Sequence, residues 1–161
     1  MPTICRLNGG VYGGATDLAL ACDFRIGTNT AEMFMPAARL GLHYYRGGLE
    51  RYVARLGLDT AKRLFLTAER IDARAMRACG FLTDLVSADE LEATVERLTD
   101  TLAAMAPLAL LGMKKHLNRI ARGALEVDDL NADIARAAKS EDIREGAAAW
   151  AAKRPPKFTG R

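Results

Sequence analysis

The sequence lacks the features that mark several common classes of protein. Aromatic residues make up only 6% of its 161 residues, and the formal net charge is +3. So weak a charge, without basic runs interleaved with aromatic rings, argues against nucleic acid as a partner. No apolar run reaches the ~20 residues that a membrane span requires, and no charged leader followed by a long apolar run is visible. We therefore expect neither a nucleic-acid nor a membrane partner.

Cysteine is sparse as well. The three cysteines, Cys5, Cys22 and Cys79, form no CxxC pair, and the two histidines stand far apart in the chain. This pattern predicts reduced thiols in a cytoplasmic protein and no metal site. We interpret the three cysteines as small buried side chains.

What is present indicates a globular domain. Half of the residues are hydrophobic, and charges of both signs are interspersed among them. The first third mixes strand and helix patterns, and the rest is largely helical. The patterns predict strands over 3–7, 23–27, 31–35 and 82–86, a loop over 41–48, helices over 16–22, 49–56, 91–105, 107–122, 130–138 and 141–152, and two further helices capped by Asp59 and Asp72. So few strands would leave sheet edges unpaired, which indicates an absent partner or N-terminal portion.

The stretch from Asn8 to Ile26 reads NGGVYGGATDLALACDFRI and concentrates four glycines ahead of a helix. A phosphate-binding loop would need Lys followed by Ser or Thr, but the chain has Ala15 and Thr16 there. The G-x-G-x-x-G spacing of dinucleotide sites is also missing. Two interpretations remain open at this point. Either the unpaired N–H groups near Gly13 and Gly14 hold an oxyanion, or the stretch is a tight strand-to-helix turn without a ligand.

Four segments together resemble the crotonase superfamily, the enoyl-CoA hydratases and isomerases. They read NGGVYGGATDLALACDFRI, LGLHYYRGGLERYVARLG, AKRLFLTAERIDARAMRACGFLTDLV and EDIREGAAAWAAKRPPKF. The resemblance implies an α/β fold, namely the C-terminal part of a spiral of ββα turns followed by a helical trimerisation region. We therefore expect a partial ββα core over 1–88 and a helical oligomerisation region over 89–161, with the family's N-terminal part absent.

The resemblance also implies a catalytic site. Gly14 would supply one of two backbone N–H groups that bind a thioester oxygen, with Gly13 beside it, and Asp17 would act as acid and base. The family's second catalytic glutamate is replaced by Ala37. We therefore expect a one-carboxylate reaction on an acyl-CoA, such as double-bond isomerisation or slow hydration. The alternative for Asp17 is a first-turn acid that interacts with the helix dipole.

Further substrate contacts follow from the same resemblance. Tyr44 and Tyr45 stand where the family has a glycine-rich loop; Tyr45 is a candidate for substrate binding, or both only reshape the pocket. Trp150 and Lys153 match residues that close the acyl-CoA site from a neighbouring subunit. The resemblance implies no metal and no cofactor besides the coenzyme A of the substrate, and a homotrimer or dimer of trimers. The alternative function is a catalytically impaired assembly module.

Overall fold

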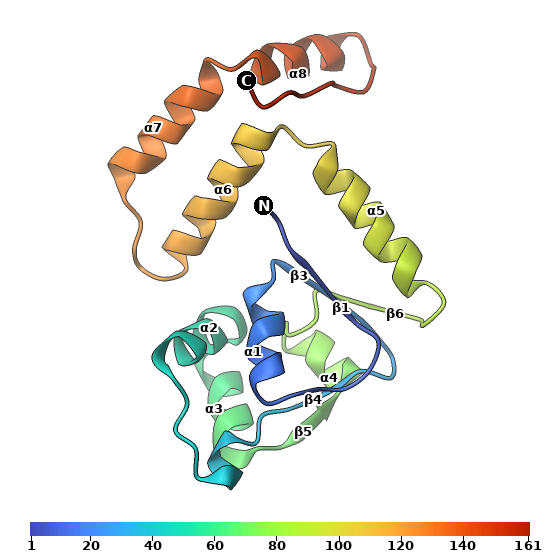
Figure 1. Ribbon diagram of the computed structural model, residues 1–161, viewed down its shortest axis with the longest axis vertical. Coiled ribbons are helices and arrows are strands. Elements are labelled where there is room, and N and C mark those ends of the chain that lie inside the picture. The colour runs from blue at the N-terminus through green and yellow to red at the C-terminus, as the bar shows by residue number, and fades with distance from the viewer. The chain divides into compact units, whose positions relative to one another are not determined.

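The computed structural model describes residues 1–161, and their contacts divide them into two units. The first unit holds residues 3–96, and the second holds residues 97–161 with residues 1–2. The first unit contains β1 (Ile4–Leu7), β2 (Val11–Tyr12), α1 (Gly14–Ala21), β3 (Phe24–Thr28), β4 (Glu32–Phe34), the 3-10 turn η1 (Ala37–Leu40), α2 (Arg46–Leu56), α3 (Leu58–Thr67), β5 (Arg70–Asp72), α4 (Ala73–Ala78) and β6 (Asp84–Val86) (Figure 1). Helix α5 (Leu91–Ala103) crosses the boundary, and α6 (Pro107–Ile120), α7 (Val127–Ala138) and α8 (Glu141–Ala151) follow it. We call residues 97–161 the helical unit.

The strands of the first unit form two small sheets. One is parallel with the order β1-β3-β6, and the other has the order β2-β4-β5, with β2 parallel and β5 antiparallel to β4. Ile26 of the central strand β3 is fully buried. Helices α1 and α2 contact each other, and the apolar core gathers side chains from both sheets and the helices, including Leu20, Met33, Leu64 and Phe81. The mixed α/β class expected from the sequence is confirmed.

Three features of this unit differ from the sequence-based expectation. Strands β2 and β5 were not predicted, because two or three residues are too short to show an alternating pattern. Helix α2 begins at Arg46 rather than near Leu49, so the glycines at 47 and 48 lie in its first turn and not in a loop. The three cysteines are unpaired but only partly buried, so the prediction that they are buried side chains is wrong.

Helix ends follow local rules with one exception. Asp72 caps α4, as predicted, because its carboxylate accepts a hydrogen bond from the Ala75 N–H at 2.8 Å. Helix α3 instead begins after Gly57, whose φ of 80° requires glycine, and Asp59 lies in the first turn.

The helical unit buries few side chains. Its buried residues are Ala149 and three polar residues: His116, Ser140 and Asp142. Asp142 accepts hydrogen bonds from the backbone N–H groups of Thr159 and Gly160, at 2.7 and 2.9 Å, so the C-terminal tail folds against the start of α8. None of the helices combines the length and apolar composition of a membrane-crossing segment.

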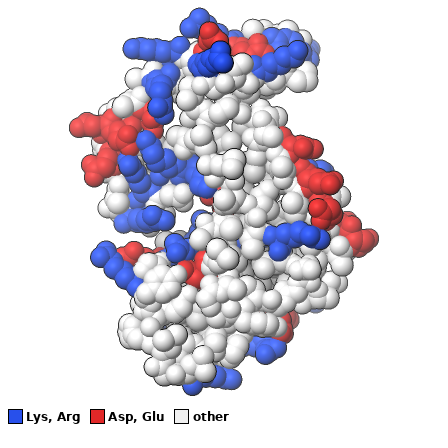
Figure 2. All heavy atoms as spheres, viewed as in Figure 1, with Lys and Arg blue, Asp and Glu red and all other residues white.

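On the face drawn in Figure 2, Lys and Arg side chains lie among Asp and Glu side chains. That face therefore carries no continuous basic field, which is the feature by which a nucleic-acid-binding surface is recognised.

Candidate active site

The glycine turn joins β2 to α1. Gly13 has φ 55° and ψ −129°, a conformation that favours glycine, and its N–H donates to the Phe34 carbonyl at 2.9 Å. Gly14 begins α1, and its N–H has no acceptor within the chain. A Cβ at either glycine would meet no atom within 4 Å. Neither crowding nor a positive φ requires glycine at position 14, and Gly14 is exposed.

Asp17 lies on the first turn of the same helix and is almost fully buried, with 3% of its surface exposed. Arg51 of α2 donates two hydrogen bonds to this carboxylate, with its Nε 2.8 Å from Oδ1 and one terminal nitrogen 3.2 Å from Oδ2. The Tyr45 hydroxyl also donates to Oδ2. Both carboxylate oxygens are therefore bonded, and the two-point contact raises the pKa of the Arg51 guanidinium.

The two neighbouring tyrosines point to different surroundings. The Tyr44 ring packs against Tyr45 and Phe65, with centroids 4.8 and 5.1 Å apart, and its hydroxyl is buried without a partner. Burial is the main cause that raises the pKa of Tyr44. Tyr45 is 56% exposed and bonds Asp17. Of the two, Tyr45 is the tyrosine that combines exposure to solvent with a hydrogen bond to the carboxylate.

Ala37, at the position where the resemblance predicts the family's second glutamate, begins η1 and is 4% exposed. Its methyl group belongs to the apolar core. A side chain of this kind cannot transfer a proton, so Asp17 is the acid that the predicted site retains.

The structure brings Gly13, Gly14, Asp17 and Tyr45 together in the first unit. Trp150 and Lys153 belong to the helical unit. Trp150 lies on α8 and is 87% exposed, and Lys153 follows α8 with a φ of 50°.

Sequence reasoning missed Arg51, which stands 34 residues from its partner Asp17. It also missed a hydrogen bond between the buried hydroxyls of Thr16 and Tyr52. No local pattern marks Arg51 as the partner of Asp17, because the pairing depends on how α2 packs against α1. Nothing in the sequence marks Thr16 and Tyr52 as partners.

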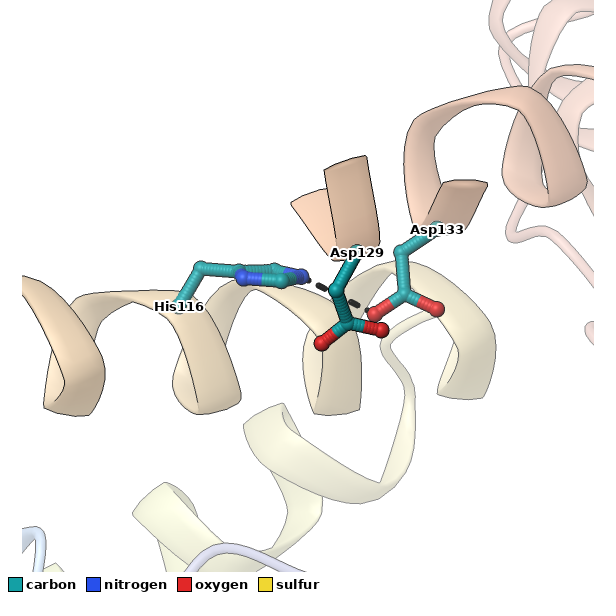
Figure 3. A group of neighbouring side chains, drawn as sticks. All are labelled: His116, Asp129 and Asp133. Carbon is teal, nitrogen blue, oxygen red and sulfur yellow. Dashed lines mark hydrogen bonds and ion pairs between the residues drawn. The ribbon is translucent and has the colours of Figure 1, made fainter. Parts of the chain in front are cut away.

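One group of side chains resembles a metal site. His116, Asp129 and Asp133 place ligand atoms within 4.8 Å of one another, and the His116 Nε2 lies 2.9 Å from an Asp133 oxygen (Figure 3). The two carboxylates are already paired with the side chains of Lys115, Arg119 and Arg136. A metal ion would have to displace these cations. The other ring nitrogen of His116, Nδ1, has no hydrogen-bond partner and does not bond the carboxylates. We assign the group to joining α6 to α7.

Comparison with known proteins gives a consistent result. The sequence model of the enoyl-CoA hydratase/isomerase family matches residues 1–161. Carnitinyl-CoA dehydratase from Proteus mirabilis is 32% identical over 99% of this chain and 64% of its own length. Methylmalonyl-CoA decarboxylase from Escherichia coli is 30% identical over 99% of this chain and 62% of its own length. The crystal structure of an enoyl-CoA hydratase/carnithine racemase from Magnetospirillum magneticum superposes with a TM-score of 0.94 at 26% identity, covering 100% of this chain and 60% of that one.

These relatives are longer than the present chain, which spans about 60–64% of their length. Their names describe a dehydratase, a decarboxylase and a hydratase or racemase. Similarity at this level therefore identifies a fold and a family, while the names of the relatives differ in the reaction.

Proposed function

The chain belongs to the enoyl-CoA hydratase/isomerase family, and on that premise we propose that its glycine turn binds the thioester oxygen of an acyl-CoA. The observation that carries the proposal is the N–H of Gly14, an exposed residue whose N–H has no acceptor within the chain. A backbone N–H at a helix N-terminus stabilises negative charge on an oxygen, and such charge develops as a thioester becomes an enolate.

Asp17 is the acid and base of the proposed reaction. It would take a proton from one carbon of the acyl chain and return a proton to another, which is a double-bond isomerisation, or deliver a proton during slow hydration. Its carboxylate is nearly inaccessible to solvent, and Tyr45 donates to one of its oxygens. Tyr45 is 56% exposed, and its hydroxyl is accordingly the group through which Asp17 would contact the acyl chain.

The remaining predictions concern contacts between copies of the chain, which the structure of a single chain does not test. Trp150 and Lys153 would contact the coenzyme A of a substrate held by a neighbouring copy, and the assembly would be a homotrimer or a dimer of trimers. Coenzyme A would enter as part of the substrate and not as a resident cofactor. The location in the cytoplasm stays a prediction from the reduced cysteines.

A direct test is calorimetric binding of crotonyl-CoA to the chain of residues 1–161, with free coenzyme A as the reference ligand. We expect crotonyl-CoA to bind. In an assay of crotonyl-CoA hydration, we expect Asp17→Asn to lower kcat by about 100-fold or more, which is the range for the loss of an acid–base catalyst. Asp59→Asn is the matched control, because Asp59 is also a first-turn acid of a helix but has no place in the site. Absence of crotonyl-CoA binding would overturn the proposed activity, and wild-type activity in Asp17→Asn would overturn the role of Asp17.

An assembly role is a second candidate, and one observation favours it. The helical unit exposes large apolar side chains, among them Leu117 at 65% and Trp150 at 87%. Such side chains are typical of surfaces that another chain covers. A protein that forms trimers in sedimentation experiments but binds no acyl-CoA would support this role instead of catalysis.

A further inference from the structure

Two buried hydroxyl groups form a row of hydrogen bonds that ends at the glycine turn. The Thr16 hydroxyl donates to the Gly13 carbonyl at 2.6 Å, and the Thr16 N–H donates to the same oxygen at 3.1 Å. The Tyr52 hydroxyl of α2 is hydrogen-bonded to the Thr16 hydroxyl. Because the Thr16 proton is directed to Gly13, Tyr52 is the donor in that bond. The row of hydrogen bonds therefore leads from the Tyr52 hydroxyl through the Thr16 hydroxyl to the carbonyl of Gly13.

The Gly13 carbonyl and the Gly14 N–H belong to one peptide group. In a planar trans peptide the C=O and the N–H point in opposite directions. Two hydrogen bonds that fix the carbonyl of Gly13 therefore also fix the direction of the Gly14 N–H. The opposite side of Gly13 is held as well, because its own N–H donates to the Phe34 carbonyl at 2.9 Å.

The turn needs such an anchor. Gly13 lies at φ 55°, and glycine has many accessible backbone conformations, so the peptide between Gly13 and Gly14 could rotate if nothing held it. Thr16 and Tyr52 are both fully buried. Valine would fill the Thr16 position equally well, and phenylalanine the Tyr52 position, so packing alone does not explain two buried hydroxyls.

We propose that Thr16 and Tyr52 are positioning residues that hold the Gly13–Gly14 peptide so that the Gly14 N–H points at the thioester oxygen. This role rests on the proposed function for its purpose but on the hydrogen bonds above for its geometry. Thr16 acts directly on the carbonyl, and Tyr52 acts through Thr16. Loss of Thr16 is therefore expected to have the larger effect.

The first arm of the test needs no substrate. Residual dipolar couplings of the Gly14 ¹⁵N–¹H bond are measured in the wild-type chain and in Thr16→Val, Thr16→Ser and Tyr52→Phe. We expect Thr16→Val to change the Gly14 coupling and broaden its signal, Tyr52→Phe to change it less, and Thr16→Ser to retain the wild-type value. Thr28→Val is the matched control, since Thr28 is as deeply buried but its hydroxyl bonds Thr30 outside the turn. A wild-type Gly14 coupling in both Thr16→Val and Tyr52→Phe overturns the proposal.

The second arm follows the thioester itself. The infrared stretch of ¹³C-carbonyl crotonyl-CoA is recorded on binding, together with kcat and KM. We expect the bound wild-type carbonyl to shift to lower frequency, and Thr16→Val to lose most of that shift and up to about 100-fold in kcat, with KM little changed. Thr16→Ser should restore both. An unchanged carbonyl shift in Thr16→Val contradicts the proposal, whereas absent binding by the wild type contradicts the proposed function and leaves the first arm decisive.

Discussion

The two units of the chain bury different kinds of residue. Every large apolar side chain that is buried lies in residues 3–91, where two sheets and their helices enclose a core. The helical unit buries one alanine and three polar residues, and holds its helices through ion pairs and a tail bonded to Asp142. The first unit thus has the packed apolar core of an ordinary protein, while the helical unit depends on polar contacts and buries no large apolar side chain. The difference shows that the candidate site and the helical unit are stabilised by different kinds of contact.

The largest expected effect on stability comes from a substitution in the core of the first unit. Leu64→Ala in α3 removes a side chain that is 1% exposed, and we expect it to cost about 2–5 kcal/mol of unfolding free energy through lost burial and a cavity. Leu117→Ala in α6 makes the same chemical change at a position that is 65% exposed, and should cost less than about 0.5 kcal/mol in dilute monomer.

Hydrogen exchange resolved by residue measures both variants, since the two units need not unfold together. A cost for Leu117→Ala that equals that of Leu64→Ala would contradict the contrast between the units. A cost that appears only as protein concentration rises would instead locate Leu117 in a contact between copies.

A smaller effect is expected from the buried carboxylate of the helical unit. Asp142→Ala leaves the N–H groups of Thr159 and Gly160 without their acceptor, which costs about 1–3 kcal/mol. We expect faster amide exchange and proteolysis in residues 157–161, with little change in the first unit. Asp128→Ala is the control, because Asp128 is an exposed acid in the first turn of α7. Equal protection of the tail in both variants would show that Asp142 does not hold it.

The smallest effect concerns acid sensitivity of the α6–α7 contact. Hydrogen bonds from Lys115 and then His116 lower the pKa of Asp133 to about 2, against ~3.9 in an unfolded chain. A carboxyl whose pKa is lowered in the folded state stabilises it above its unfolded pKa, and that contribution is lost as pH falls from about 4 to about 2. Circular dichroism during acid titration should therefore show helix loss in this window that Asp133→Asn reduces.

The same titration of Asp128→Asn provides the comparison, since that side chain is exposed on the same helix. Identical acid transitions in wild type and Asp133→Asn would rule out this contribution. High salt should also weaken the effect, because the partners are partly exposed and their attraction is screened.

Much of the fold could be predicted because its signals are local. The spacing from Leu91 to Met105 predicted α5, Pro107 predicted the start of α6, and Asp72 predicted the cap of α4. The position of the turn before α1 followed from the glycines. Strands β2 and β5 escaped prediction because their existence depends on pairing with β4, and short strands carry no pattern of their own.

The candidate site divides in the same way. The resemblance placed Gly14 and Asp17 on one turn of a helix, and this spacing follows from 3.6 residues per turn. Arg51 and Tyr45 meet Asp17 from 34 and 28 residues away. That pairing depends on how α2 packs, so no local pattern contains it.

The sequence by itself determined the glycine turn, the acid three residues after Gly14, an alanine at position 37 where the resemblance predicts a second acid, and the helical character of the second half. These depend on residue type and short spacing, which the chain carries before it folds. Only the tertiary structure decided that Arg51 bonds Asp17, that Tyr45 and not Tyr44 donates to it, and that the Tyr52 hydroxyl is hydrogen-bonded to Thr16. Each of those contacts joins residues about 30 positions apart, and only the packing of α1 against α2 brings them together.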